Sequence, residues 1–274
     1  MTEPAFTSAP PTAPRPAPDE PGGHALLAGK VALVTAAAGT GIGSATARRF
    51  LQEGATLVVS DAHERRLAET VESLAELTAD GKPPLGVTCD VTDEDQVQAL
   101  FAATHDAHGR LDIVVNNAGL GGTAPLVEMT DEQWFKVVDV TLNGTFRCTR
   151  AALRLLGDQG SGVIVNNASV LGWRAQAGQA HYAAAKAGVM ALTRCAAVEA
   201  APLGVRVNAV APSLAMHPFL AKVTSDELLD ELASREAFGR PAEVWEIATV
   251  IAFLASEYST YMTGEVVSVS SQHP

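Results

Sequence analysis

Short apolar runs alternate with longer amphipathic stretches from Lys30 almost to the end of the chain. The run from Val31 to Thr35 and the run from Thr56 to Ser60 are apolar at most positions, which is typical of strands buried on both faces. Strands that alternate with helices form a parallel sheet with helices on both faces. This alternation therefore predicts an α/β protein before any single residue is considered.

The alternation predicts seven strands in a single domain over residues 25–274, without internal repeats. Such a domain is a Rossmann-type, doubly wound parallel seven-stranded sheet with helices on both faces. The strands are expected at residues 31–35, 56–60, 85–89, 111–115, 162–166, 205–210 and 266–270. Helices are expected at residues 42–54, 63–78, 93–108, 131–156 with a break near its start, 242–256, and in a stretch that carries residues 182 and 186 and ends near 201. Residues 212–241 are expected to form a loop-and-helix insert.

The bulk composition narrows the classes of function. The 274 residues are 47% hydrophobic, which is ample for a core, yet no apolar run reaches the ~20 residues of a membrane span. Nineteen Lys and Arg against 31 Asp and Glu give a net charge of -12, which disfavours binding to a nucleic-acid backbone. Cys89, Cys148 and Cys195 have no metal-ligand spacing and fit a reducing compartment. We therefore expect a soluble cytoplasmic protein with no metal, nucleic-acid or membrane site.

The first 24 residues differ in composition from the rest of the chain. They contain seven prolines, interspersed with Ala, Thr and Ser. Such a segment cannot pack a core, so residues 1–24 are expected to form a disordered or polyproline-like tail. It has no apolar segment after a basic start, so it does not read as a secretory signal. A role in partner binding is the alternative to a plain extension.

Tyr182 and Lys186 lie four residues apart in an expected helix, and Ser169 precedes the Tyr by 13 residues. Positions i and i+4 share one face of a helix, so the ammonium can lie beside the phenol and favour its anion. A free Tyr has a pKa of about 10, and lowering that pKa by one unit needs about 1.4 kcal/mol of differential stabilisation of the anion. With Ser169 to hold a substrate oxygen, the three residues can move a proton on or off an alcohol. A Tyr/Lys pair alone is more often an ordinary helix face.

The context of this pair supports the functional interpretation. Polar or glycine residues follow directly after most of the expected strands, and in parallel α/β sheets ligands bind at the carboxyl ends of the strands. These residues are Gly39 to Gly43, Asp61, Asp90, Asn117, Ser169 and Ser213.

The glycine cluster and two acidic residues predict a dinucleotide site. Gly39, Thr40, Gly41, Ile42 and Gly43 lie between the first expected strand and its helix, where glycines let a pyrophosphate approach the helix N-terminus. Asp61 ends the second strand, where a carboxylate can accept hydrogen bonds from ribose hydroxyls and repel a 2′-phosphate. Asp90 can bond the adenine amino group, with Val91 beside the ring. Because Thr40 is not basic and Arg65 and Arg66 are expected to face water, NAD is favoured over NADP.

The chain resembles the classical short-chain dehydrogenase/reductase family from about Leu27 to its C-terminus. The motifs that carry the resemblance are the glycine turn, Asn116-Asn117-Ala118-Gly119, Ser169, Tyr182-x-x-x-Lys186 and Arg206 to Pro212. The resemblance implies that Tyr182 is the general acid/base, that Lys186 binds the nicotinamide ribose and lowers the pKa of Tyr182, and that Ser169 orients the substrate oxygen. It places Asn117, Ala118, Gly119 and Asp90 along the cofactor, and Pro212, Leu214 and Ala215 near its carboxamide. It also implies a homotetramer or homodimer.

The sequence departs from the family pattern at three places. The glycine turn is one residue longer than usual, with Ala36 at the position of the first Gly. The family's catalytic Asn, which holds a water in a proton relay, aligns with Thr141; Asn143 lies about 200° away on a helix and is not expected to replace it. Ser213 follows Pro212 in place of Gly, and His217 occupies a position often held by Thr.

The stretch Leu171 to Gln176 and the C-terminal Thr263 to Pro274 resemble an actinobacterial subgroup related to 3-oxoacyl thioester reductases. Its members include an enzyme of steroid degradation that acts on a bicyclic ring fragment carried as a CoA thioester. Trp173, Gln179 and His217 are the candidate substrate contacts, and the 212–241 insert is expected to cover the substrate. The favoured function is thus NAD-dependent interconversion of a secondary alcohol and a ketone. An NADPH-dependent acyl thioester reductase and a non-catalytic NAD-binding protein remain alternatives.

Overall fold

The computed structural model describes residues 14–78, 81–216 and 226–272. Its main feature is the predicted seven-stranded parallel sheet, in which the strands lie in the order β3-β2-β1-β4-β5-β6-β9. The strands are β1 (Val31–Val34), β2 (Thr56–Asp61), β3 (Leu85–Thr88), β4 (Ile113–Asn116), β5 (Gly162–Asn167), β6 (Val205–Pro212) and β9 (Val266–Val269). The chain builds outward from β1 through β2 to β3, then returns to place β4 on the other side of β1. The strand order therefore reverses between β1 and β4, as in a doubly wound sheet.

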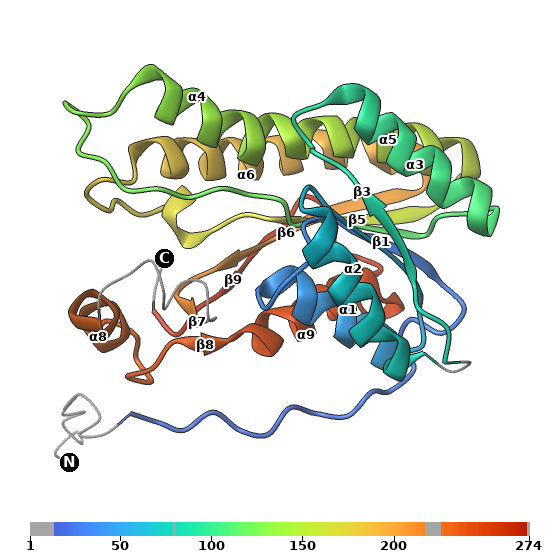
Figure 1. Cartoon of the computed structure of the whole chain (residues 1–274), viewed down its shortest axis with the longest axis horizontal. Coiled ribbons are helices and arrows are strands. Elements are labelled where there is room, and N and C mark those ends of the chain that lie inside the picture. The colour runs from blue at the N-terminus through green and yellow to red at the C-terminus, as the bar shows by residue number, and fades with distance from the viewer. Residues whose placement is uncertain (1–13, 79–80, 217–225, 273–274) are drawn as a thin grey trace, which may run out of the picture.

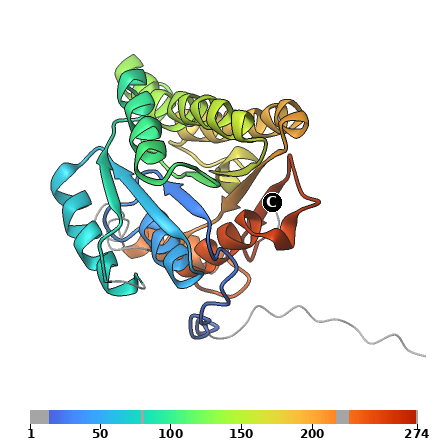
Figure 2. The same cartoon turned by 90° about the vertical axis from the view of Figure 1, so that its right-hand side faces the viewer.

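Helices cover both faces of the sheet, as Figures 1 and 2 show. One layer contains α1 (Ile42–Gln52), α2 (Glu64–Leu74) and α9 (Val244–Ala255). The other contains α3 (Glu94–His108), α5 (Gly144–Gln159) and α6 (Ala180–Ala200), with α4 (Asp131–Val138) ahead of α5. The single α/β domain expected from the alternating pattern is confirmed.

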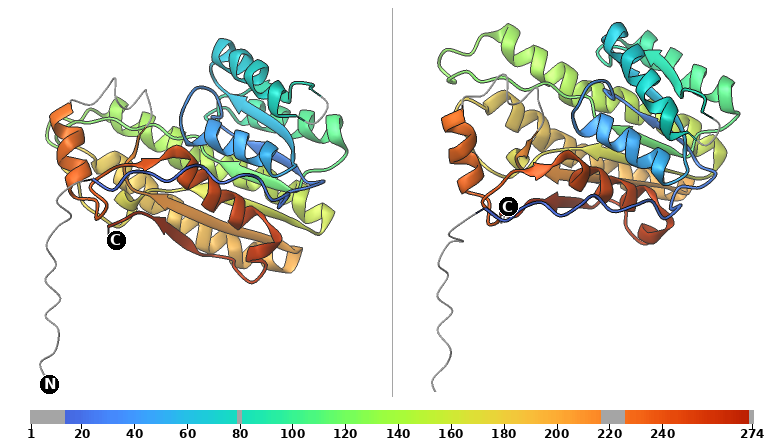
Figure 3. Two further views of the ribbon diagram at one scale, coloured as in Figure 1. Left: turned by 90° about the horizontal axis from the view of Figure 1, so that it is seen from below. Right: turned by 60° about the horizontal axis from the view of Figure 1, so that its bottom comes forward.

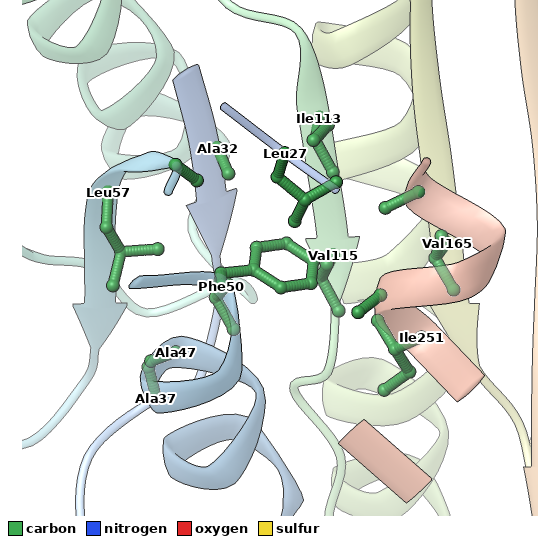
Figure 4. Close-up of a cluster of buried hydrophobic side chains, with 14 of the residues drawn as sticks. Leu27, Ala32, Ala37, Ala47, Phe50, Leu57, Ile113, Val115, Val165 and Ile251 are labelled. Atoms are coloured by element: carbon green, nitrogen blue, oxygen red, sulfur yellow. The ribbon is translucent and has the colours of Figure 1, made fainter. Parts of the chain in front are cut away.

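The core follows the two-residue period of the strands. Ala32 and Val34 of β1 pack toward α1 and α9, whereas Val31 and Leu33 pack toward α3 and α5. The side chains between the sheet and helices α1 and α9 form the first core cluster. Phe50 of α1 lies at its centre and is fully buried (Figure 4). Because both faces of β1 are buried, all four of its residues can be apolar without exposing a patch.

Several boundaries differ from expectation. The expected helix at 63–78 ends as an α-helix at Leu74 and continues as a short 3₁₀ turn, Ala75–Leu77. The expected helix at 131–156 is interrupted between α4 and α5 by a π-helical turn, Asp139–Asn143, which agrees with the expected break but lies farther along. The expected helix at 242–256 begins at Val244, because Ala242–Glu243 (β8) pairs in parallel with Ala215–Met216 (β7).

The proline-rich segment is not a free tail over its whole expected length. Residues 14–24 run in extended form along the body toward α8 (Asp226–Ser234), beneath α9 and β8 (Figures 1 and 3). The carbonyls of Pro21 and Gly22 accept hydrogen bonds from Arg49, and the amide of His24 donates to Glu53. Part of the expected tail thus lies against the body of the domain, because Arg49 and Glu53 bind its backbone at residues 21–24. Residues 1–13 lie outside the described part.

Candidate active site

The strand ends bring the candidate residues to one edge of the sheet. β1, β2, β4, β5 and β6 are parallel neighbours, so the segments after their carboxyl ends share that edge. Ser169 follows β5 and caps a 3₁₀ turn, Val170–Gly172. The adjoining helix α6 carries Tyr182 and Lys186 on its first two turns. The strand order thus brings residues that are far apart in sequence together in one site.

Tyr182, Lys186 and Ser169 come together as the sequence predicted. The Lys186 Nζ atom lies 5.5 Å from the centroid of the Tyr182 ring, and the Ser169 side chain hydrogen-bonds the Tyr182 side chain. Lys186 also donates to the backbone carbonyl of Asn167 at 2.5 Å. Lys186 is 3% exposed and Ser169 is 8% exposed, whereas Tyr182 is half-buried. The phenol is therefore held between a hydroxyl and a buried amine.

Burial controls the protonation of this pair. Loss of water raises the pKa of Tyr182 to about 12, and the hydrogen bond from Ser169 offsets only part of that rise. Loss of water also lowers the pKa of Lys186 from 10.5 to about 7. The expected lowering of the Tyr182 pKa by Lys186 is not found, because burial raises the pKa of the phenol and leaves the neighbouring amine only half charged at pH 7. At neutral pH Tyr182 is a proton donor.

A network of amides connects the site to the centre of the sheet, and part of it escaped the sequence analysis. The Asn117 side-chain NH₂ donates to the carbonyls of Thr35 and Ala36, at 3.2 and 3.0 Å. Its carbonyl oxygen accepts from the Asn167 side chain at 2.9 Å. Asn167 thus touches Asn117 through its side chain and Lys186 through its backbone. The signal that could have found it is the pair of polar residues Asn166 and Asn167 at the end of an apolar strand.

Thr141 lies in the site, but its hydroxyl is engaged. Thr141 is fully buried in the π-helical turn, and its Oγ1 accepts from the Leu120 amide at 3.0 Å and donates to the Leu120 carbonyl at 3.2 Å. A Cβ built on Gly119 would lie 3.8 Å from Thr141 Oγ1 and 3.4 Å from Lys186 Nζ, so the two groups flank the same glycine. Asn143 is exposed and bonds Asp139, which agrees with its expected direction away from the site. Thr141 therefore fastens the loop after β4 beside Lys186.

The glycine turn adopts a conformation that its sequence only partly anticipates. Ala36, at the position of the first family Gly, has a positive φ of 49°, and Gly39 has φ 91°. A Cβ on Gly43 would lie 2.4 Å from Asn117 Nδ2, so the start of α1 packs directly on that amide. A Cβ on Gly39 or Gly41 would meet nothing within 4 Å among the described residues. The turn thus leaves open space beside Gly39 and Gly41 at the N-terminus of α1, a position that favours an anion, although the Gly39 amide itself donates to Thr70 Oγ1 at 3.2 Å.

Asp61 stabilises the glycine turn through hydrogen bonds to backbone amides. Its carboxylate accepts hydrogen bonds from the Ala38 amide at 3.2 Å and the His63 amide at 2.9 Å. The Arg66 guanidinium lies 3.9 Å from the carboxylate and is about half exposed, whereas Arg65 is largely exposed. Both arginines are exposed, as expected, although Arg66 also lies within ion-pair distance of Asp61.

Asp90 and Val91 are placed differently from each other. Asp90 is exposed after β3 and accepts two hydrogen bonds from Thr92, at 2.9 and 2.8 Å. Val91 is 6% exposed and packs on α5, where a Cβ at Gly144 would lie 2.5 Å from it. Val91 therefore offers little surface to a ligand ring.

The segment after β6 begins the insert. Pro212 is buried at the end of β6, the Leu214 carbonyl accepts from the Ala242 amide at 2.8 Å, and Ala215 is buried in the first core cluster. Trp173 is 42% exposed beside the Ser169 turn, and Gln179 caps α6 while its side chain donates to Thr123 at 3.0 Å. His217 lies outside the described residues. Trp173 and Gln179 thus lie in the segment between Ser169 and Tyr182.

A nicotinamide dinucleotide fits the described residues. The open space beside Gly39 and Gly41 suits a pyrophosphate, and Asp61 retains unused acceptor positions for hydroxyls. Gly119, with Lys186 beside it, continues the same edge toward Tyr182. Within the described residues no group of three or more metal-ligating side chains occurs, and none of the described helices is long and apolar enough to span a membrane.

Comparison with known proteins gives consistent relatives. A family model described as enoyl-(acyl carrier protein) reductase matches residues 36–271. A protein of Mycobacterium tuberculosis (strain ATCC 25618 / H37Rv) named (5R,7aS)-5-hydroxy-7a-methyl-1-oxo-2,3,5,6,7,7a-hexahydro-1H-indene-carboxyl-CoA reductase is 65% identical over 260 residues, which cover 94% of this chain and 98% of that protein. The cis-4-hydroxycyclohexanecarboxylate dehydrogenase of Sinomonas cyclohexanicum is 43% identical over 89% of this chain and 96% of its own length. The crystal structure of a short chain dehydrogenase from Mycobacterium smegmatis is 59% identical, with a TM-score of 0.84 over 94% of this chain and 99% of that chain.

Proposed function

The chain belongs to the short-chain dehydrogenase/reductase family, and from that premise we propose that it is an NAD-dependent enzyme that interconverts a secondary alcohol and a ketone on a CoA thioester. The observation that carries the proposal is the Tyr182 phenol, which is hydrogen-bonded to Ser169 and flanked by the buried Lys186 amine. This arrangement matches an acid that delivers a proton to a carbonyl oxygen, with a hydroxyl to hold that oxygen.

The proposed chemistry assigns a separate task to each side chain. Bound NAD would supply hydride chemistry at its nicotinamide ring, next to the phenol. In the reduction direction Tyr182 donates its proton to the substrate oxygen, and in the oxidation direction its phenolate accepts that proton. Ser169 orients the oxygen, and Lys186 binds the nicotinamide ribose. Because the pKa of Tyr182 is about 12 without ligands, oxidation requires additional positive charge in the complex.

The substrate class follows from the names of two relatives. One is named for a hydroxylated, oxo-substituted hexahydroindene carried as a CoA ester, and the other for a hydroxycyclohexane carboxylate. Both names describe a hydroxyl on an alicyclic ring that also bears a carboxyl function. We propose the same pattern here, a ring alcohol or ketone in a bicyclic acyl-CoA, with Trp173, which is 42% exposed, as an apolar wall beside Ser169.

Turnover by the Tyr182→Phe variant tests the catalytic assignment. With hydroxyacyl-CoA and ring-alcohol substrates, kcat is expected to fall by about 10²- to 10⁴-fold, because the acid is removed while the ring remains. Tyr261→Phe is the matched control, since that ring is fully exposed. Unchanged NADH formation by Tyr182→Phe on a good substrate would show that the assignment is wrong. Absence of turnover by the native protein across these thioesters would remove the substrate proposal and leave the family chemistry.

Direct titration with NADH and NADPH tests the cofactor. Asp61→Ala is expected to weaken NADH binding by about tenfold or more, since hydrogen bonds to a carboxylate contribute about 1.5–3 kcal/mol. Asp106→Ala, an exposed carboxylate on α3, is the control.

The NADPH-dependent acyl thioester reductase is the second candidate, favoured by the Arg66 guanidinium 3.9 Å from Asp61. It predicts tight NADPH binding that Arg66→Ala weakens, with weak NADH binding. A non-catalytic NAD-binding protein would show tight binding without turnover, but it leaves the Ser169, Tyr182 and Lys186 cluster without a purpose.

A further inference from the structure

Both ends of the described chain meet one short segment of the insert. This return segment, residues 236–239, connects α8 to β8. The Arg15 amide donates to the Phe238 carbonyl at 2.8 Å, and the Arg15 guanidinium lies 5.3 Å from the centroid of the Phe238 ring. A Cβ on Gly239 would lie 3.3 Å from Pro14 Cα. The N-terminal segment is therefore in direct contact with the return segment (Figure 3).

The N-terminal segment is fastened to the body before it reaches the insert. Arg49 and Glu53 form an ion pair one turn apart on α1, and their side chains are 3% and 0% exposed. Arg49 donates to two carbonyls of residues 21–22, and Glu53 accepts from the amides of His24 and Leu26 at 2.8 and 3.0 Å. A buried ion pair that binds four backbone groups holds residues 21–26 against α1.

The C-terminal residues hold the other side of the return segment. The Glu236 carboxylate is 4% exposed and accepts hydrogen bonds from the Ser271 hydroxyl at 2.7 Å and the Gln272 side chain at 2.9 Å. The side-chain oxygen of Gln272, Oε1, in turn accepts a hydrogen bond from the Arg174 guanidinium at 2.7 Å. Arg174 is five residues beyond Ser169, next to Trp173. Gln272 thus connects the insert to the loop that carries the proposed catalytic serine.

We propose that residues 14–15 and 271–272 clamp the return segment and so position it and the Ser169 loop for substrate, with Arg15 and Gln272 as positioning residues. The substrate part of this inference rests on the proposed function. The family model matches residues 36–271. Arg15 and Gln272 lie outside that stretch.

The test compares Arg15→Ala and Gln272→Ala with Asp19→Ala, an exposed residue on the same N-terminal segment. Hydrogen exchange is followed at the amides of Gly239 and Ala242, which donate to the Glu236 and Leu214 carbonyls in the native structure. Faster exchange is expected in both test variants and not in the control. KM for the thioester is expected to rise about three- to fivefold, the effect of losing one exposed cation–π or hydrogen-bond contact, while kcat and the Kd of NADH stay unchanged. Arg15→Lys is expected to restore most of the native KM.

Two results would overturn the clamp. Native exchange rates in both test variants would show that the chain ends do not hold the return segment. Faster exchange with an unchanged KM would show that the contacts are structural only. The exchange measurement needs no substrate, so a failure of the clamp is distinguishable from a failure of the proposed activity, which would appear as missing turnover in the native protein.

Discussion

Lys186→Met is expected to make the cofactor-free protein more stable near neutral pH while it removes a proposed catalytic group. Burial lowers the pKa of Lys186 from 10.5 to about 7. In the unfolded chain this amine is protonated at pH 7.5, whereas in the folded protein most of it is neutral. Folding must therefore release a proton, and that release opposes folding.

The difference between the unfolded pKa of Lys186, 10.5, and its folded pKa, about 7, lowers the free energy of unfolding by up to about 5 kcal/mol, at about 1.4 kcal/mol per pKa unit. The penalty is absent above pH 10.5, grows as the pH falls, and is complete below about pH 7. At pH 7.5 it amounts to about 4 kcal/mol, and at pH 9.5 to about 1 kcal/mol. The variant loses the hydrogen bond from Lys186 to the Asn167 carbonyl, which costs about 1–3 kcal/mol. The net gain is about 2 kcal/mol at pH 7.5 and about zero at pH 9.5.

The assay is denaturant unfolding of both proteins without nucleotide, at one protein concentration, from pH 7.5 to 9.5. The difference in free energy of unfolding between variant and native protein is the measured quantity, since other titrating groups cancel in it. Lys136→Met, an exposed lysine on α4, controls for the loss of a lysine as such. A difference that does not change with pH would refute the reasoning, because it would mean that Lys186 keeps its charge in the folded protein.

Three further predictions concern other parts of the framework. Ala36→Gly is expected to raise the free energy of unfolding by about 0.5–1 kcal/mol, because the left-handed conformation costs an L-residue about 1–2 kcal/mol and Gly loses part of this gain to chain entropy; a lower thermal midpoint would contradict it. Glu53→Gln is expected to destabilise the protein by about 3 kcal/mol at pH 7, because it breaks the buried pair with Arg49. Backbone and Arg49 hydrogen bonds outweigh burial and lower the pKa of Glu53, so this loss should shrink as the pH falls below 4.5 and through the lowered pKa; a loss that persists in acid would argue against the pair. Thr141→Val should cost about 2 kcal/mol by leaving the Leu120 amide and carbonyl unpaired, whereas Thr141→Ser should remain near native stability.

The architecture could be predicted from the sequence because a strand that is buried on both faces is apolar at consecutive positions. A segment such as Val31–Val34, apolar at every position, requires cover on both faces, and parallel pairing between helices provides it. The i, i+4 spacing of Tyr182 and Lys186 likewise fixes one helix face whatever surrounds it. These properties depend on neighbours a few residues away, so they could be predicted with their positions.

Other features depended on neighbours far away in sequence. The break in the helix expected at 131–156 falls at Asp139–Asn143 instead of near its start. The first two residues of the helix expected at 242–256 form strand β8 instead, because they pair with β7. Thr141 was recognised as a departure, but only its contact with Leu120 shows that its hydroxyl is already used. Arg66 approaches Asp61 although nothing in their spacing required it.

The sequence by itself determined the sheet, its strand ends and the residues that gather there, because hydrophobic period and helix spacing are local. Only the tertiary structure decided the charge of those residues and the course of the chain ends. At pH 7 Lys186 is about half neutral and Tyr182 keeps its proton, because burial removes water from both groups and shifts the pKa of each. Residues 21–26 lie against α1 because the buried Arg49 and Glu53 side chains bind their backbone. Desolvation and hydrogen bonding are sums over neighbours in space, and those neighbours exist only once the chain has folded.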